Sequence, residues 1–325
     1  MHAVYGVLSQ GFGKFDLQGG LRAERASRDF ALTQPSTSYP YTYNSLFPSG
    51  VVLYNKSDAT QMKVSYSRRI RRPGTQELNP FPTFFDAQNV FIGNARLNPE
   101  YTDALELGLT HSGQLGSLQL SPFYRRTKNV IRVVVNTADT IQGREVTSVS
   151  FQNLAKSNSW GTDVNGTLKL GPRFSGLAGF NIFKMVTDGG STSATSLSSD
   201  AVTWSYRLNV SSQLTQTLIA QANYFYRAPM NFERGQFSAV KQAGFALRQK
   251  LYSDAAAVSL RVVDPFNTMG FRVKVGNDNI TQLTTRTFGV RAAFLTFQYN
   301  FGQAPKIRQR PDQPQDTRPG FPSGG

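Results

Sequence analysis

Residues 202–211 read VTWSYRLNVS, a stretch in which apolar and polar residues alternate without a break. Val202, Trp204, Tyr206, Leu208 and Val210 share one face, and the polar residues between them share the other. Because successive side chains of a strand point to opposite faces, this stretch predicts a β-strand with one apolar and one polar face. The same alternation recurs at 104–111, 242–251, 257–263 and 294–301.

The length and spacing of these runs predict a membrane barrel. Many extend over roughly ten residues or more, which is long for a soluble protein and right for strands that cross a bilayer obliquely. Short connections lie at 10–13, 55–59, 112–115, 171–173, 214–216 and 252–254, and they take turns with long ones at 27–44, 71–99, 136–144, 188–199, 228–236 and 264–284. Outer-membrane barrels have short periplasmic turns and long extracellular loops, whereas a soluble β-sandwich, the alternative, has no reason for this succession.

We therefore expect an all-β protein, an antiparallel transmembrane β-barrel with about thirteen strands. The strands expected to run outward are 14–26, 60–70, 116–135, 173–187, 216–227 and 254–263, and the returning ones are 1–9, 45–54, 101–111, 145–170, 200–213, 237–251 and 285–301. Bacterial barrels have even strand numbers, so we expect Met1 to lie inside a longer protein and the barrel here to be partial. Residues 1–302 would form the barrel, and the Pro-rich residues 303–325 a flexible, disordered periplasmic tail.

Composition argues against several other classes of function. The 325 residues carry a net charge of +15, with 17% charged and 12% aromatic residues, which is unlike a disordered chain. There is no Cys, and His2 and His111 are the two histidines, so we expect no enzyme, no metal site and no cofactor. No apolar run is long enough for a transmembrane helix. The basic residues are scattered among strand ends and the tail, so nucleic acid is not an expected partner.

Residues 64–100 carry a family resemblance. They read VSYSRRIRRPGTQELNPFPTFFDAQNVFIGNARLNPE, which resembles the barrel of TonB-dependent outer-membrane receptors. The similarity continues through 105–135, 151–166, VVDPFNT at 262–268 and the closing LTFQYNFG at 295–302. The pattern is most similar to the outer membrane protein beta-barrel family, whose members often carry a carboxypeptidase-regulatory-like domain upstream.

The resemblance implies a localisation in the outer membrane and a barrel of about 22 strands around a plug, of which this chain would supply the last part. The plug domain and the contact with the TonB complex would lie in the upstream part of the protein. The implied function is energy-coupled uptake of a bulky ligand: an iron chelate, a vitamin, an oligosaccharide or a peptide. Two alternatives stay open, a stand-alone outer-membrane pore or adhesin-like barrel, and a soluble β-rich binding protein.

Candidate binding residues cluster where expected strands reach the outer surface. Alternation places Arg68 and Arg126 with the lipid-facing residues, where a guanidinium could pair with the phosphates of lipopolysaccharide; solvation of loop bases is the alternative. Alternation places Arg69, Arg71 and Arg125 toward the lumen. The connection 71–99 is rich in rings, and its candidate ligand-binding residues are Arg71, Arg72, Phe84, Phe85, Phe91 and Asn94. These rings could stack on a ligand or pack the loop onto the barrel rim, and the rim role is favoured. Trp160, Trp204, Tyr206, Tyr224, Tyr226, Tyr299 and Phe301 are expected in aromatic girdles.

Overall fold

The computed structural model describes residues 1–29, 31–33, 36–84, 86–141, 143–188, 199–232, 235–252, 255–276 and 281–301. The elements, in chain order, are β1 (His2–Phe12), β2 (Phe15–Arg28), β3 (Ala31–Thr33), β4 (Ser36–Ser38), β5 (Tyr41–Ser57), β6 (Thr60–Arg71), α1 (Thr75–Leu78), β7 (Thr83–Phe84), β8 (Asn89–Phe91), β9 (Glu100–Gly113), β10 (Gly116–Ile141), β11 (Arg144–Leu170), β12 (Phe174–Asp188), β13 (Ser199–Gln213), β14 (Leu218–Arg227), β15 (Met230–Phe232), β16 (Gly235–Phe237), β17 (Val240–Leu251), β18 (Ala256–Val263), β19 (Gly270–Gly276), β20 (Thr281–Thr287) and β21 (Ala292–Tyr299). Within these ranges, no helix is long and apolar enough to cross a membrane.

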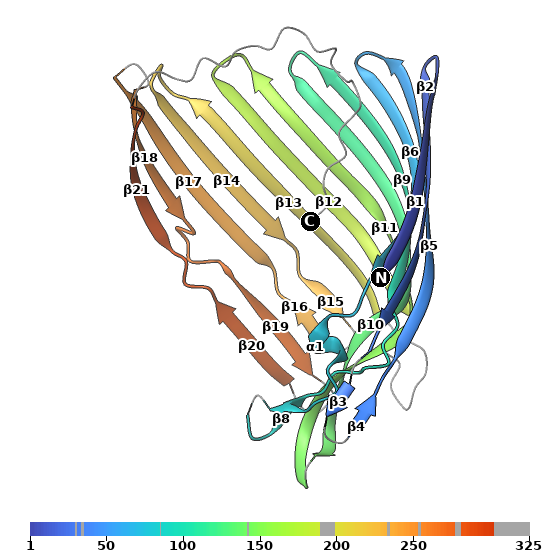
Figure 1. Ribbon diagram of the computed structural model, residues 1–325. Coiled ribbons are helices and arrows are strands. Elements are labelled where there is room, and N and C mark those ends of the chain that lie inside the picture. Colours follow the sequence, from blue (N-terminus) through green and yellow to red (C-terminus); the bar gives the residue numbers. More distant parts are fainter. Residues whose placement is uncertain are drawn as a thin grey trace.

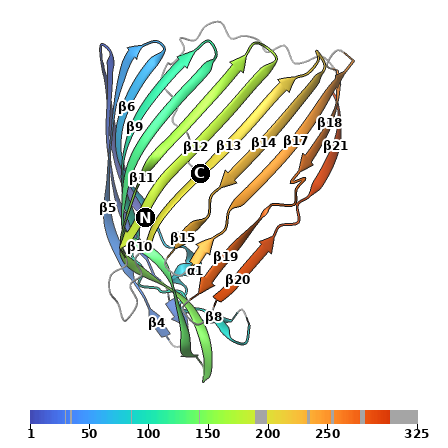
Figure 2. The same ribbon diagram turned by 180° about the vertical axis from the view of Figure 1, so that it is seen from behind.

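One large antiparallel sheet forms a curved wall (Figures 1 and 2). The sheet has 15 strands, and all except β7 and β8 follow one another as β1-β2-β5-β6-β9-β10-β11-β12-β13-β14-β17-β18-β21. This path has the thirteen strands expected from the sequence. Among the described residues β1 pairs with β2 alone and β21 with β18 alone, so both edges of the wall are open. The wall is therefore an incomplete barrel.

The two ends of the wall differ as the connection lengths predict. Short turns join β1–β2, β5–β6, β9–β10, β11–β12, β13–β14 and β17–β18 at the upper end in Figure 1. The long connections gather at the opposite end, where β15-β16-β19-β20 form a four-stranded sheet and β3-β4 a two-stranded one. The long connections thus build secondary structure of their own.

The outer face of the wall is apolar, as the alternation predicts. On β13, the exposed large side chains are Val202, Trp204, Tyr206 and Leu208. The aromatic rings gather across neighbouring strands, since Trp204 lies 4.9 Å and Tyr206 5.5 Å from Tyr226 between ring centroids. Tyr299 and Phe301 form a separate edge-to-face pair at 4.7 Å. Phe180 and Tyr224 extend the first group.

Three expected boundaries are wrong. The expected loop 136–144 is a continuation of β10 and β11, whose pairing runs on to Ile141↔Arg144. The expected strand 285–301 is two strands, because β20 leaves the wall to pair with β19 and β21 alone pairs with β18. The expected loop 264–284 contains β19 and the start of β20. In each case the pairing with a neighbouring strand, rather than the local pattern, decides which residues belong to a strand. Most of the expected loop 188–199 and the tail 303–325 lie outside the described residues.

Candidate functional site

The rim segment, residues 72–99, joins β6 to β9 and has a small core of its own. Val90 and Leu97 are fully buried. Leu78 on α1, Ala95 and Pro99 are buried as well. A connecting segment with a buried core holds one shape, and α1, β7 and β8 all form within it.

Local contacts fix the shape of α1 and of the chain beside it. The backbone N–H of Gly74 donates to the Glu77 carboxylate at 2.7 Å, which caps the start of α1. Gly93 lies so close to α1 that an added Cβ would stand 2.5 Å from the carbonyl oxygen of Asn79. Its own N–H donates to that same oxygen at 2.7 Å. Only glycine fits at position 93.

Asparagine side chains fasten the rim segment to the long β10–β11 hairpin. Asn94 donates through Nδ2 to the carbonyl oxygen of Phe151 at 3.0 Å. Asn153 Oδ1 accepts from the Asn98 backbone N–H at 2.7 Å, and its Nδ2 donates to the Asn98 carbonyl at 2.9 Å. Phe91 packs edge-to-face on Phe151 at 5.2 Å, and β8 pairs in parallel with β11. Of the expected ligand residues, Phe91 and Asn94 therefore have structural contacts.

A buried carboxylate holds the other side of the rim segment. Glu24 on β2, whose side chain is 5% exposed, accepts from Arg22 Nε at 2.6 Å and from Arg72 Nη2. Arg72 Nε also donates to the Tyr43 hydroxyl at 2.9 Å. Burial opposes the charge of Arg72, but Tyr43 and Glu24 together raise its pKa above the ordinary value. Through these contacts with Glu24 and Tyr43, Arg72 attaches the rim segment to the wall.

Arg71 is also paired with carboxylates of the chain. Its guanidinium lies 2.7 Å from Glu77 on α1 and 3.3 Å from Glu100 at the start of β9. Arg28, at the end of β2, donates to the carbonyl oxygens of Ala95 and Leu97. Of the arginines expected to face the lumen, Arg71 contacts Glu77 and Glu100, and Arg125 contacts Glu106.

Aromatic rings remain on the surface of the rim segment. Phe84 is 37% exposed and Phe81 is 45% exposed. Phe85, which the sequence also predicts as a ligand-binding residue, lies outside the described residues. Asp86, beside them, accepts from the backbone N–H groups of Gln88 and Asn89, both at 2.8 Å, so the turn after the rings is hydrogen-bonded.

On the outer face, Arg68 and Arg126 differ. Arg68 forms a two-point contact with Asp103, through Nε at 2.7 Å and Nη2 at 3.1 Å. Tyr66 donates to the same carboxylate at 2.7 Å. Arg126 lies opposite Asp103 in the β9–β10 register, but Asp103 bonds to Arg68 rather than to it.

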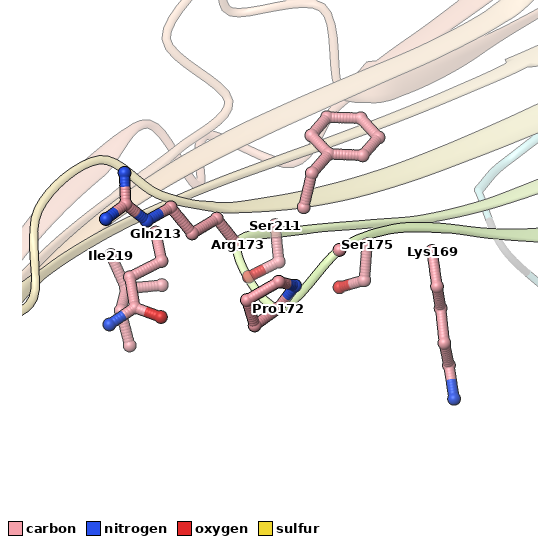
Figure 3. A pocket seen from close by; sticks show the side chains of 9 residues that line it. Lys169, Pro172, Arg173, Ser175, Ser211, Gln213 and Ile219 are labelled. Carbon is pink, nitrogen blue, oxygen red and sulfur yellow. The ribbon is translucent and has the colours of Figure 1, made fainter. Parts of the chain in front are cut away.

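At the short-turn end, a cavity of about 380 Å³ lies beside the β11–β12 and β13–β14 turns (Figure 3). Lys169 and Arg173 are its basic residues, and their side chains point away from each other. They therefore do not converge on one anion. A second hollow, of about 740 Å³, is lined by Gly166, Gly176 and Ala178 among others, and its surface is mostly apolar. Within the described residues, no cluster of His, Cys, Asp and Glu could hold a metal ion.

Several residues of the site give no local signal in the sequence. Glu24 and Arg72 are 48 residues apart, and Asn98 and Asn153 are 55 apart. Each side chain looks like an ordinary polar strand or loop residue by itself. The partners become evident only through the sheet register and the folding-back of residues 72–99.

Comparison with known proteins agrees with this geometry. The siderophore receptor PirA from Pseudomonas aeruginosa is 16% identical, with a TM-score of 0.58, over 82% of this chain and 45% of that one. The copper transporter OprC is 15% identical, with a TM-score of 0.60, over 81% of this chain and 42% of that one. The ferric yersiniabactin uptake receptor FyuA from Yersinia pestis is also 15% identical, with a TM-score of 0.57, over 88% of this chain and 43% of that one. The chain thus spans less than half the length of these proteins and shares their fold. No curated protein sequence matches it.

Residues 1–299 match the model of one protein family. The match covers every strand of the wall, from β1 to β21. The localisation that follows is the cell outer membrane, with the apolar face of the wall toward lipid. The chain belongs to the outer membrane protein beta-barrel family.

Proposed function

We propose that this chain is the C-terminal barrel part of a TonB-dependent outer-membrane receptor that imports a bulky ligand: an iron chelate, a vitamin, an oligosaccharide or a peptide. The observation that carries the proposal is the open wall of thirteen strands, apolar outside, whose fold matches part of siderophore and copper transport proteins. The long connections would face the outside of the cell, and the short turns the periplasm.

The open edges of β1 and β21 support a partnership with further strands. An unpaired edge presents N–H and C=O groups that cost several kcal/mol each in lipid, because no water is there to bond them. Closure by strands from the rest of the protein removes that cost. A plug would then occupy the lumen, and the TonB complex would act on that plug.

The rim segment would shape the entrance for the ligand. Arg71, Arg72, Phe91 and Asn94 hold it against the wall, so we assign them a supporting role. The exposed ring of Phe84, with Phe85 next in sequence, is then the surface proposed to meet the ligand. A flat, conjugated chelate would stack on such rings.

The first test is an immunoblot of outer-membrane fractions with an antibody to residues 303–325. The proposal expects a membrane band far heavier than the 35.9 kDa of this chain. A membrane band near that mass would favour a small pore or adhesin-like barrel. Signal confined to the soluble fraction would contradict the membrane assignment.

The transport step needs a second test in the full-length protein. Uptake of a radiolabelled ferric siderophore is the first probe, measured in cells with and without functional TonB. The proposal expects uptake to depend on TonB, and Phe84→Ala to lower uptake at limiting ligand. Equal uptake without TonB would contradict the energy-coupled mechanism for that probe.

A further inference from the structure

The inner face of the wall, opposite the apolar outer face, carries arginines on its C-terminal strands. The exposed Leu208, Leu247 and Leu260 mark the outer face of β13, β17 and β18. Each of these leucines has an arginine next to it in the chain, and the alternation of a strand turns that arginine inward. These inner arginines, all of them exposed and here termed the arginine ladder, are Arg207, Arg248 and Arg261.

The sheet register sets the arginine ladder at successive depths of the wall, on strands that lie side by side (Figure 1). Through β14 and β17, Arg261 lies in register with Ser211, which is four residues along β13 from Arg207. Arg248 lies in register with Gln213, two residues farther along β13. At about 3.4 Å per residue, the arginine ladder therefore descends about 20 Å toward the short turns.

The strands that carry the arginine ladder contribute almost no negative charge. Along the described strands β13, β14, β17, β18 and β21, Asp200 is the only acidic residue, and it binds Lys184 at 2.7 Å. Asp264, directly after β18, is fully buried and accepts from backbone N–H groups of its own turn. Arg125 on β10, by contrast, has Glu106 on β9 at 3.2 Å. The inner face of the wall is thus partly neutralised toward β9 and positively charged toward β18.

The contacts that hold the arginine ladder are made with neutral amides. Arg207 donates through Nη2 to Asn165 Oδ1 at 3.0 Å, and Arg248 donates through Nη2 to Gln298 Oε1 at 3.4 Å. Gly179 leaves the space in which Arg207 lies, since an added Cβ would stand 2.7 Å from its Nε. An amide leaves the charge of a guanidinium uncompensated, so these arginines can still bind an oxyanion.

We infer that the receptor carries an anionic ligand, one with carboxylate or phosphate groups, and that this ligand passes along the arginine ladder through the lumen. Cations along a channel wall concentrate anions, and several sites of moderate strength let a bound anion leave as well as enter. The planar guanidinium group of arginine also matches the two oxygens of a carboxylate or phosphate. The inference rests on the proposed function, to which it adds the charge of the ligand and its route.

The test measures ion selectivity in the full-length protein without its plug, in a planar bilayer with a potassium chloride gradient. We expect a reversal potential that shows preference for chloride, and block of the current by citrate, a tricarboxylate probe. Arg248→Gln/Arg261→Gln should lose most of this preference and weaken the citrate block about tenfold, as for the loss of charge-assisted hydrogen bonds. The control, Arg25→Gln/Arg126→Gln, removes the same charge from arginines that alternation places on the outer face, and it should keep both properties.

Preference for potassium, unchanged selectivity in the first variant, or an equal loss in the control would overturn the inference. A second measurement uses the purified full-length protein with its plug. Ser259→Cys introduces a thiol directly opposite Arg248 in a chain that has no cysteine. A negatively charged methanethiosulfonate should modify this thiol faster than a positively charged one, and Arg248→Gln should remove the difference.

Equal rates with the two thiol reagents would contradict an anion route. No reaction with either would mean that the plug covers the arginine ladder, and would contradict it as well. Neither measurement depends on TonB, so failure here leaves TonB-dependent uptake unaffected, and failure of that uptake leaves the ion selectivity readable.

Discussion

Glu24 illustrates how much one residue can hold at this rim. Its nearly buried carboxylate joins Arg22 on β2 to Arg72 in the rim segment. We predict that Glu24→Gln costs about 1–3 kcal/mol locally, because two guanidinium groups lose their counterion while water still reaches them in part. Hydrogen exchange over residues 72–99 should rise. Glu145→Gln, at an exposed position, is the control, and equal protection in both variants would contradict the role of Glu24.

Asp264 gives a pH-dependent prediction at the same scale. Its fully buried carboxylate accepts from the backbone N–H of Thr268 at 2.8 Å and of Met269 at 2.9 Å, and from the Thr268 hydroxyl at 3.1 Å. Burial raises its pKa, but these bonds outweigh burial and hold the pKa below the ordinary value.

A lowered folded-state pKa means that this stabilisation is present above the unfolded value, about 4, and is lost as the pH falls through the folded value. We therefore predict that residues 264–269 lose hydrogen-exchange protection in acid. Asp264→Ala should lose it already at neutral pH, by about 1–3 kcal/mol of local stability. Protection that is the same in the variant and the native protein would disprove this account.

At the scale of elements, Gly93 decides whether the end of the rim segment can pack against α1. A Cβ there would meet the backbone of α1 at 2.5–2.6 Å. Backbone cannot yield as a flexible side chain can, so Gly93→Ala should separate the end of the rim segment, residues 93–99, from α1 and leave the wall intact. Limited trypsin digestion should then cut at Arg96. Gly113→Ala, where nothing lies within 4 Å of the new Cβ, is the matched control and should stay resistant.

The elements also show why a local pattern misplaced some boundaries. Turn-forming residues at 136–144 predict a loop, yet β10 and β11 go on pairing there because each supplies the other's hydrogen bonds. Near the end of the chain, Phe288–Arg291 interrupt a continuous run and direct β20 to β19. Strand length follows the available partner, which sequence periodicity does not reveal.

At the scale of the whole molecule, the open edges make a prediction about conductance. Along the described part of the chain, thirteen strands follow one path and β1 and β21 do not pair with each other, so this wall does not close around a channel. We predict that this chain alone, refolded in detergent and added to a planar bilayer, gives no steady, uniform conductance. The full-length protein without its plug should give one. A stable, single-valued conductance from the chain alone would favour the stand-alone pore.

The sequence by itself determined the number of strands in the wall, which residues face lipid and which family the chain resembles. These properties are local, since a period of two and the lengths of connections can be read within one stretch such as 202–211. The tertiary structure alone decided which charges meet. Arg68 finds Asp103 35 residues away, while Lys156 lies opposite Lys128 on β10 and opposite Asp188 on β12. The physical reason is the register: hydrogen bonding between neighbouring strands fixes which side chains lie opposite one another, and so which charges can pair within the chain.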